Sequence, residues 1–358
     1  MKTYLTNQIK NVALLGNTGS GKTLLAESMM FEGKVIERKG TIEGKNTVSD
    51  YSEIEQQNQR SIFSTILYTE FQDHKLNILD TPGSDDFVGA VISSMRPTDT
   101  VIMVVNAQYG VEVGTEIFSR HADAMHKPMV IAVNQLDQDK ANFDSTVESL
   151  KQSFGGKVVL IQYPVNPGTE FNAFIDVLTM KLYKFKGDTG IREDLPIPAE
   201  EMDKATELHN ALIEAAAEND ESLMEKFFEQ GTLSEDEMRK GLSLGLRNRG
   251  LFPVFCTSGK RNIGTKRLMD FIINVAPDAS LSPMPKNNEN KEIKCDANAP
   301  TSLFIFKTSV EPHIGEINYF RVMSGKVTEG MDLVNSNNDT KERIAQLFVV
   351  AGKNRTKV

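Results

Sequence analysis

Cysteine is nearly absent from the 358-residue sequence, which contains only Cys256 and Cys295. Two cysteines so far apart cannot build a disulfide framework or a zinc site, which fits the reducing cytosol. The sequence also lacks any run of about 18 consecutive apolar residues, the length that a membrane-spanning helix needs. Its N-terminus, MKTYLTNQIK, has no apolar core of a signal peptide. We therefore expect a soluble, cytoplasmic protein with no membrane partner.

An excess of basic residues is likewise missing. The chain has 40 Lys and Arg against 49 Asp and Glu, a formal net charge of −9, which argues against broad, nonspecific binding of nucleic acid. The whole acidic excess lies in Ala199 to Lys240, where thirteen acidic residues accompany four basic ones. Such a stretch is most often a solvated helix face, and a docking surface is the alternative.

Apolar runs alternate with helical patterns along the first half of the chain. Strands are predicted at 12–15, 76–79, 101–105 and 129–133, and helices at 21–30, 113–125 and 143–154. This alternation predicts an α/β fold with a mostly parallel sheet that is covered by helices on both faces.

The alternation changes after the strand predicted at 158–161. Residues 174–185 predict β-structure and 199–246 predict acidic helices, whereas 252–256 and 265–275 restore strand and helix. We therefore expect an inserted α+β subdomain, 164–251, within an α/β domain made of 1–163 and 252–280. Residues 281–300 have linker composition. Strands predicted at 302–308, 317–322 and 331–334 then begin a β-barrel domain, 301–358, that is incomplete.

Gly16 to Thr23, GNTGSGKT, matches the phosphate-binding pattern GxxxxGK[ST] between a predicted strand and a predicted helix. Its glycines let backbone N–H groups turn inward around phosphate oxygens, and the helix N-terminus adds positive potential. Lys22 is expected to reach the β- and γ-phosphates, and the Thr23 hydroxyl to bind Mg²⁺. A chance glycine-rich turn is the alternative. The α/β domain is thus predicted to be a P-loop NTPase domain, with nucleotide-binding residues Gly16, Asn17, Gly19, Ser20, Gly21, Lys22 and Thr23.

Base selectivity is predicted by NQLD, Asn134 to Asp137, which ends a predicted strand. The Asp137 carboxylate can accept hydrogen bonds from guanine N1–H and N2–H₂, and adenine offers no such pair. A lone NxxD is often a turn or a helix cap, but its place after the phosphate loop favours guanine. Ser258, in Thr257-Ser258-Gly259, is expected to complete the base pocket through a backbone N–H to guanine O6.

Asp80-Thr81-Pro82-Gly83 follows the strand predicted at 76–79. The Asp80 carboxylate is expected beside Mg²⁺, where it holds a water ligand. Gly83 can bring its N–H to the γ-phosphate because no Cβ blocks the approach. The predicted ligands are therefore GTP or GDP with Mg²⁺.

The order and spacing of these motifs resemble translation elongation factor G. The resemblance rests on Lys10–Thr23, DTPGxxDF in Asp80–Phe87, QYGVEVGTE in Gln108–Glu116, NxxD, the inserted subdomain and the β-domain. Divergent elongation factor G paralogs are most similar, because their phosphate loop reads more like GNTGSGKT and their switch I contains a stretch similar to TVSDYSEIE.

The resemblance implies a translation-factor GTPase that acts on the ribosome in tRNA and mRNA translocation. It implies that Thr47–Ile62 is switch I, a segment that orders around Mg²⁺ and γ-phosphate. Ser61 stands at the family's metal-binding threonine. The alternative is that the polar stretch Asp50–Gln59 is simply a solvated loop.

Three positions depart from the family pattern. Ser84 stands where the family has a histidine that positions the attacking water, Gly19 replaces a phosphate-loop aspartate, and Gln135 replaces the lysine whose stem covers guanine. Loss of a water-positioning or charge-stabilising group typically costs on the order of 10² to 10⁵ in rate. We therefore expect GTP binding with slow or absent hydrolysis, and assign no catalytic residue. The alternative is that Asp85 or ribosomal RNA substitutes for the histidine.

Three functions remain open from the sequence. The first is a translocase with slow chemistry, in which GTP mainly orders switch I. The second is an active GTPase that serves ribosome recycling or another step, and the third is a regulator that occupies the ribosomal factor site without promoting movement. The resemblance also implies that the acidic subdomain can dock a ribosomal stalk protein, and we expect a monomer.

Overall fold

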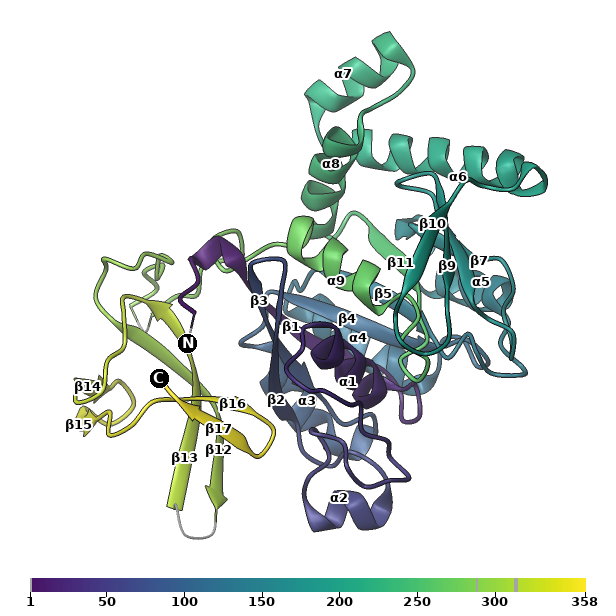
Figure 1. The fold of residues 1–358 in the computed structure, drawn as a ribbon. Coiled ribbons are helices and arrows are strands. Elements are labelled where there is room, and N and C mark those ends of the chain that lie inside the picture. The colour runs from purple at the N-terminus through teal and green to yellow at the C-terminus, as the bar shows by residue number, and fades with distance from the viewer. Residues whose placement is uncertain (1, 288, 312–314) are drawn as a thin grey trace.

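The computed structural model describes residues 2–287, 289–311 and 315–358. Its largest sheet has seven strands in the order β2-β3-β1-β4-β5-β11-β6 (Figure 1). The strands are β1 (Ile9–Leu15), β2 (Thr65–Phe71), β3 (His74–Asp80), β4 (Thr100–Asn106), β5 (Met129–Asn134), β6 (Val158–Leu160) and β11 (Phe252–Cys256). Strand β2 pairs antiparallel with β3, and the other pairs are parallel. The predicted α/β fold class is confirmed.

Helices cover both faces of this sheet. α1 packs beside α9 on one face, and α3 packs beside α4 on the other (Figure 1). The helices around the sheet are α1 (Lys22–Glu32), α3 (Val88–Met95), α4 (Val113–Ala124), α5 (Phe143–Phe154) and α9 (Thr265–Asn274). Every residue of β4 and β5 is buried, which explains why the central strands read as unbroken apolar runs.

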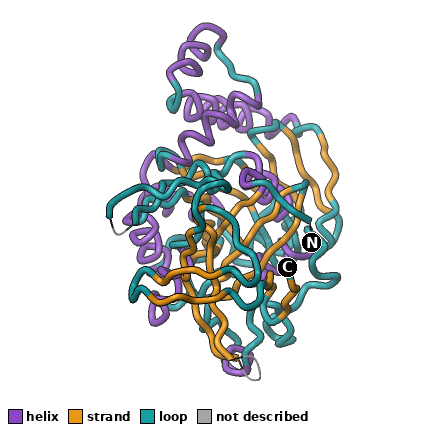
Figure 2. The backbone as a smooth tube through the Cα atoms, turned by 90° about the vertical axis from the view of Figure 1, so that its left-hand side faces the viewer, coloured by secondary structure: helices purple, strands orange, loops and turns teal. Residues whose placement is uncertain are grey.

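The segment between β6 and β11 contains a second, antiparallel sheet and three helices. Its antiparallel sheet has the order β10-β9-β8-β7, and its helices lie at the upper end of the molecule in both views (Figures 1 and 2). The elements are β7 (Gln162–Pro164), β8 (Ala173–Asp176), β9 (Lys181–Phe185), β10 (Arg192–Leu195), α6 (Ala199–Ala217), α7 (Glu221–Gln230) and α8 (Glu235–Arg247). Asp176 Oδ2 accepts from Arg267 Nε of α9 at 2.7 Å in a fully buried ion pair, which fastens the two parts together.

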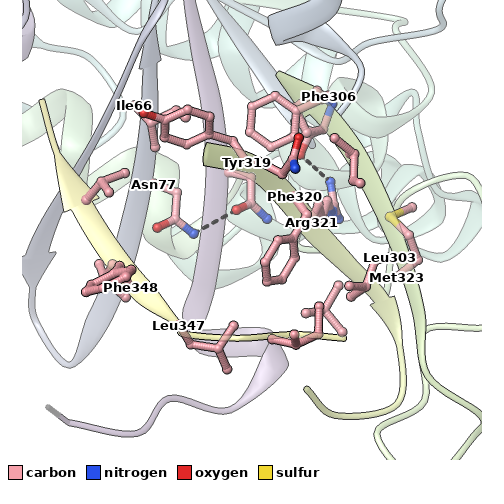
Figure 3. A pocket seen from close by; sticks show the side chains of 18 of the residues that line it. Ile66, Asn77, Leu303, Phe306, Tyr319, Phe320, Arg321, Met323, Leu347 and Phe348 are labelled. Atoms are coloured by element: carbon pink, nitrogen blue, oxygen red, sulfur yellow. Dashed lines mark hydrogen bonds between the residues drawn. The ribbon is translucent and has the colours of Figure 1, made fainter. Parts of the chain in front are cut away.

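The described residues of the C-terminal part form three antiparallel strand pairs. They are β12 (Ser302–Glu311) with β13 (Gly315–Ser324), β14 (Asp332–Asn335) with β15 (Thr340–Arg343), and β16 (Phe348–Ala351) with β17 (Asn354–Lys357). A cavity of about 1150 Å³ lies between these strands and the β1–β3 edge of the large sheet. Figure 3 shows Phe306, Tyr319, Phe320 and Phe348 around it. Its lining contains no residue of the phosphate loop.

Contacts at several points join the C-terminal strands to the α/β part, among them one at Asp99 and one at Gly352. Asp99, immediately before β4, accepts a hydrogen bond from Arg321 Nη2 of β13 at 2.6 Å, and its side chain is completely buried. At the other contact, the Gly352 amide of the β16–β17 turn donates to the Ile66 carbonyl at 3.0 Å. A Cβ on Gly352, whose φ is +59°, would lie 2.2 Å from the Val48 carbonyl oxygen. The C-terminal hairpin therefore rests directly on the segment that precedes β2.

No helix in the described part of the chain is both long enough and apolar enough to cross a membrane.

Candidate guanine-nucleotide site

The phosphate loop, residues 16–21, connects β1 to α1 and folds around Lys22. Lys22 is 5% exposed, and its Nζ donates to the carbonyl oxygens of Gly16 at 2.8 Å and Asn17 at 3.0 Å. Burial lowers the pKa of this amine to about 8, and the neighbouring Asp80 and Asp50 act in the opposite direction. The loop therefore holds a buried amine where the sequence predicts phosphate oxygens.

Side chains from other loops hold the remaining residues of the phosphate loop in position through hydrogen bonds. Asn17 Nδ2 donates to Glu112 Oε1 at 2.6 Å, and the Gly19 carbonyl accepts from Gln135 Nε2 at 2.8 Å. Ser20 is completely buried, and its hydroxyl has no hydrogen-bond partner among the described residues. Left-handed backbone occurs at Gly16, Gly19 and Gly21. This conformation allows the loop to curl with its amides inward.

Asn134, at the end of β5, connects three loops. Its Nδ2 donates to the Ser20 carbonyl at 2.8 Å. Its Oδ1 accepts from Thr257 Oγ1 at 3.2 Å and from the Gly259 amide at 3.0 Å. The phosphate loop, the NQLD stretch and the loop after β11 therefore meet at one side chain, although they lie far apart in the sequence.

Asp137 is half-buried, and its Oδ1 is enclosed without a hydrogen-bond partner among the described residues. An enclosed carboxylate oxygen is costly unless a donor reaches it. The Ser258 amide, expected to face guanine O6, donates to the Ile263 carbonyl at 2.9 Å. The Ser258 hydroxyl accepts from the Arg261 amide at 3.1 Å. In this structure Ser258 holds the shape of its loop and does not offer a free amide.

Three hydroxyls and a carboxylate meet where the sequence predicts Mg²⁺. Asp80 Oδ2 accepts from Thr23 Oγ1 at 2.8 Å and from Ser49 Oγ at 2.6 Å. The Ser61 hydroxyl lies 3.2 Å from Thr23 Oγ1. Burial raises the pKa of Asp80, and the two hydroxyl donors act against that rise. The predicted metal residues Thr23, Ser61 and Asp80 are thus brought together.

The segment predicted as switch I is not an open polar loop. It contains the helix α2 (Glu53–Asn58), which begins at the capping box of Ser52 and Glu55. Glu55 is 1% exposed, and its Oε1 accepts from the amides of Ile62 at 3.1 Å and Phe63 at 3.0 Å. The alternative of a solvated loop at 50–59 is therefore wrong for this structure, because buried carboxylates of the segment bind its own backbone or face the site.

Gly83 brings the chain past the phosphate loop at very short range. A Cβ at position 83 would lie 2.5 Å from Lys22 Nζ and 2.6 Å from the Thr18 amide nitrogen. The close approach is possible only because residue 83 is glycine. Its backbone therefore lies beside the amine that is expected to contact the γ-phosphate.

Ser84, the next residue, is directed elsewhere. Its Oγ donates to Asp86 Oδ2 at 3.1 Å in an exposed turn, at the start of the 3-10 helix η2 (Asp85–Phe87). Asp85, the other polar side chain considered for the histidine's role, is exposed. The described structure shows no hydrogen bond from a side chain of this turn to Lys22 or Thr23.

The unpaired atoms of the site test whether a nucleotide and a cation fit. Buried oxygens without partners in the described part of the chain include Ser20 Oγ, Asp80 Oδ1 and Asp137 Oδ1. Amide and hydroxyl donors of a guanosine nucleotide, and a hard cation, are the partners that such oxygens need. No three His, Cys, Asp or Glu side chains among the described residues form a metal-binding group alone. The Thr23 and Ser61 hydroxyls, phosphate oxygens and water are the further ligands that Mg²⁺ would take beside Asp80.

Several residues of the site were missed from the sequence, among them Ser49, whose hydroxyl donates to Asp80. Asn106 Nδ2 donates to Gln135 Oε1 at 2.7 Å, Glu112 holds Asn17, and Glu55 holds the end of switch I. The capping-box pattern Ser52-x-x-Glu55 is a signal that predicts the helix α2 and the inward Glu55. Asn106 and Glu112 have no comparable local signal, since each is defined by a contact with a distant loop.

Comparisons with known proteins agree with this arrangement. The sequence matches the family described as Elongation factor Tu GTP binding domain over residues 7–278, and Elongation factor G domain 2 over residues 300–358. It is 30% identical over 354 residues to a Thermotoga maritima protein named Elongation factor G-like protein, covering 98% of this chain and 50% of that protein. A crystal structure of a Thermus thermophilus protein has a TM-score of 0.88 at 28% identity, covering 98% of this chain and 50% of that one.

The fold and the site define a P-loop GTPase of the translation-factor class with a GTP/GDP-binding domain. The chain belongs to the elongation factor G family, which confirms the resemblance of its motifs. It spans about half the length of the relatives that it matches.

Proposed function

We propose that this protein binds GTP and GDP with Mg²⁺ and acts on the ribosome, in the cytoplasm, in tRNA and mRNA translocation. The observation that carries the proposal is the contact set of Asn134, which joins the phosphate loop to both predicted base-binding loops. One side chain thereby fixes the distance between the phosphate end and the base end of a single ligand.

Each predicted residue has a separate role in this proposal. Lys22 and the amides of residues 16–21 bind phosphate oxygens, and the Gly83 amide approaches the γ-phosphate. Asp137 recognises the guanine edge, and Asn134 holds its loop in place. Thr23, Ser61 and Asp80 would hold Mg²⁺, which neutralises phosphate charge when it is bound. Ser258 stabilises the loop after β11 through its hydrogen bonds with Ile263 and Arg261.

Slow or absent hydrolysis is the second part of the proposal. A water-positioning side chain must reach the water with a nitrogen or oxygen at hydrogen-bond distance. The Ser84 hydroxyl is short and is bonded to Asp86. GTP would therefore act chiefly as a ligand that orders switch I, and hydrolysis would not set the pace of the ribosomal step.

The proposal divides the chain as the sequence predicts. Residues 1–163 and 252–280 form the GTP-binding domain, 164–251 the inserted subdomain, 281–300 the linker and 301–358 part of a β-barrel domain. The acidic helices α6 to α8 are the proposed docking surface for a ribosomal stalk protein, and the protein works as a monomer. Their exposed carboxylates favour a basic partner surface.

Calorimetry and turnover test the proposal together. Titration with GTP, GDP and ATP in the presence of Mg²⁺ should give binding heat for the guanine nucleotides only. Steady-state hydrolysis should rise little when ribosomes are added. Equal affinity for ATP would contradict the assigned base pocket. Ribosome-stimulated turnover at the rate of an ordinary elongation factor would favour an active GTPase, for example one that serves ribosome recycling.

A further inference from the structure

Glu27 is a buried carboxylate of α1 that binds two backbone amides of a remote segment. The residue is 1% exposed. Its Oε2 accepts from the Gly40 amide at 2.7 Å, and its Oε1 accepts from the Val48 amide at 2.6 Å. Burial raises the pKa of this carboxyl group, and the two amide hydrogen bonds act against that rise. One side chain therefore holds both ends of the segment 40–48, which runs into switch I.

The sequence of α1 places Glu27 one turn after the predicted metal residue Thr23. Residues four apart lie on the same face of a helix, so one face of α1 carries both side chains. Ser28, the next residue, donates from its Oγ to the Gly259 carbonyl at 2.5 Å. A short stretch of α1 therefore contacts the predicted cation site, the segment before switch I and the loop after β11.

Lys39 joins the segment before switch I to the loop after β11. Its Nζ donates to the Lys260 carbonyl at 2.7 Å. The Lys39 ammonium group also acts to lower the pKa of Glu27, so the charges of the two side chains favour each other. The segment 39–48, called the switch I root below, is thus held by side chains outside the phosphate loop and the predicted cation site.

The contacts of the predicted cation site begin directly after the switch I root. Ser49 Oγ donates to Asp80 Oδ2 at 2.6 Å, and the Ser49 carbonyl accepts from Thr65 Oγ1 at 3.0 Å. Because Glu27 holds the amide of Val48, it places the backbone one residue before this hydroxyl. The position of the root therefore determines whether Ser49 can reach Asp80.

We propose that Glu27 and Lys39 are positioning residues of switch I: they fix the switch I root in the GTP and GDP states alike, so that only the residues from Ser49 onward respond to the γ-phosphate. This inference rests on the proposed function, in which GTP orders switch I. A root that is already in place reduces the conformational entropy that switch I loses when it orders. Glu27 and Lys39 thereby favour the triphosphate over the diphosphate.

The test compares the affinities for a nonhydrolysable GTP analogue and for GDP, measured by calorimetry with Mg²⁺. In Glu27→Gln the side-chain amide has only one oxygen, so one backbone N–H loses its acceptor. The matched control is Glu43→Gln, which changes an exposed carboxylate within the root. The affinity for the analogue relative to GDP should fall about tenfold in Glu27→Gln and stay unchanged in Glu43→Gln. Equal losses for both nucleotides, or no loss, would overturn the inference.

Lys39→Met tests the same preference without altering the buried carboxylate. The variant removes the hydrogen bond to the Lys260 carbonyl, so the preference for the analogue should fall here as well. It should return in Lys39→Arg, whose guanidinium group can still donate. Arg38→Met, which changes the exposed neighbouring cation, should match the wild type. A preference that Lys39→Met leaves unchanged would contradict the role assigned to Lys39.

Trypsin cleavage tests where the fixed part of the segment ends. Lys45 lies in the switch I root and Arg60 in switch I, and both are exposed. Cleavage after Lys45 should be equally slow with GDP and with the analogue, and faster in Glu27→Gln. Cleavage after Arg60 should be slowed by the analogue alone. Protection of Lys45 that requires the analogue would overturn the inference, whereas a wild type that binds neither nucleotide contradicts the proposed function itself.

Discussion

Gln135 Nε2 donates a hydrogen bond to the Gly19 carbonyl oxygen 2.8 Å away, and Gln135 Oε1 accepts one from Asn106 Nδ2 at 2.7 Å. The amide therefore braces the phosphate loop against the end of β4. From the sequence alone, Gln135 indicates the loss of a contact with guanine, because it replaces the family's lysine. The structure shows that the side chain keeps a contact with the phosphate loop through neutral groups.

Replacing Gln135 by alanine removes both hydrogen bonds and leaves the Asn106 amide without its partner. The expected loss in GDP affinity is about 1 to 2 kcal/mol, or roughly 5- to 30-fold in Kd. Stopped-flow measurement of the release of a fluorescent GDP analogue checks it. A release rate within about twofold of the wild type, well below the loss expected for two hydrogen bonds, would show that the brace does not support the bound nucleotide.

Replacing Asp137 by asparagine should change the base that is preferred. The carboxylate accepts two hydrogen bonds, whereas an amide accepts one and donates one. Guanine presents an NH₂ group at C2, and xanthine presents a carbonyl there. Asp137→Asn should therefore lose GDP affinity by at least about tenfold and gain affinity for xanthosine diphosphate in competition binding. Equal weakening for both nucleotides would place Asp137 outside the base pocket.

Introducing histidine at Ser84 should restore a group that can position water. Positioned general acid or base groups typically contribute about 10²- to 10⁴-fold, so Ser84→His should raise ribosome-dependent turnover by about 10²-fold or more. Single-turnover hydrolysis with saturating ribosomes measures the chemical step. Ser84→Ala serves as the control and should match the wild type. A histidine variant with no gain would favour Asp85 or ribosomal RNA in the missing role.

Replacing Arg321 by alanine should destabilise the protein through Asp99. The carboxylate would keep hydrogen bonds from Asn11 Nδ2 at 2.7 Å and Ser282 Oγ at 2.8 Å, but it would lose its buried cation. Breaking a buried ion pair by removing one partner costs about 3 to 5 kcal/mol. Urea unfolding should show a loss of that size.

The matched control for this substitution is Arg343→Ala, which removes an exposed arginine of β15. Its effect should stay within about 0.5 kcal/mol, as is usual for surface positions. Equal losses for the two variants would mean that the Arg321 contact contributes no more than any surface arginine.

Strands whose buried residues are nearly all apolar could be predicted from the sequence. Strands that bury polar side chains were harder to predict. The strand β4 is apolar along most of its length because helices cover both faces. The strand β2 was not predicted, because two of its buried positions are Thr65 and Thr69. Their hydroxyls donate to the carbonyls of Ser49 and Met29, both at 3.0 Å, so the tertiary structure satisfies groups that look exposed in the sequence.

The helix α3 was also missed, for a related reason. Its sequence VGAVISSM contains residues of weak helix propensity. The Ser93 and Ser94 hydroxyls donate back to the carbonyls of Gly89 and Ala90 at 2.9 and 2.8 Å. Local composition therefore favoured a loop, whereas packing against α4 determines the helix.

The site was predictable where a motif is contiguous. The phosphate loop and NQLD each carry their chemistry within eight residues or fewer. The partners that place them, Asn106 and Glu112, act across loops that are remote in the sequence. Asp50 was visible only as a polar residue, because its burial follows from the packing of switch I against Asp80.

The seating of Gly352 on Val48 has a mechanical consequence. The Val48 carbonyl oxygen lies 2.2 Å from the place that a Cβ on residue 352 would take, so any residue other than glycine would collide there with the segment that leads into switch I. A movement of Val48 toward the β16–β17 hairpin is therefore expected to require movement of the hairpin as well. The position of the C-terminal strands would then be coupled to Ser49, the next residue, whose hydroxyl donates to Asp80 Oδ2.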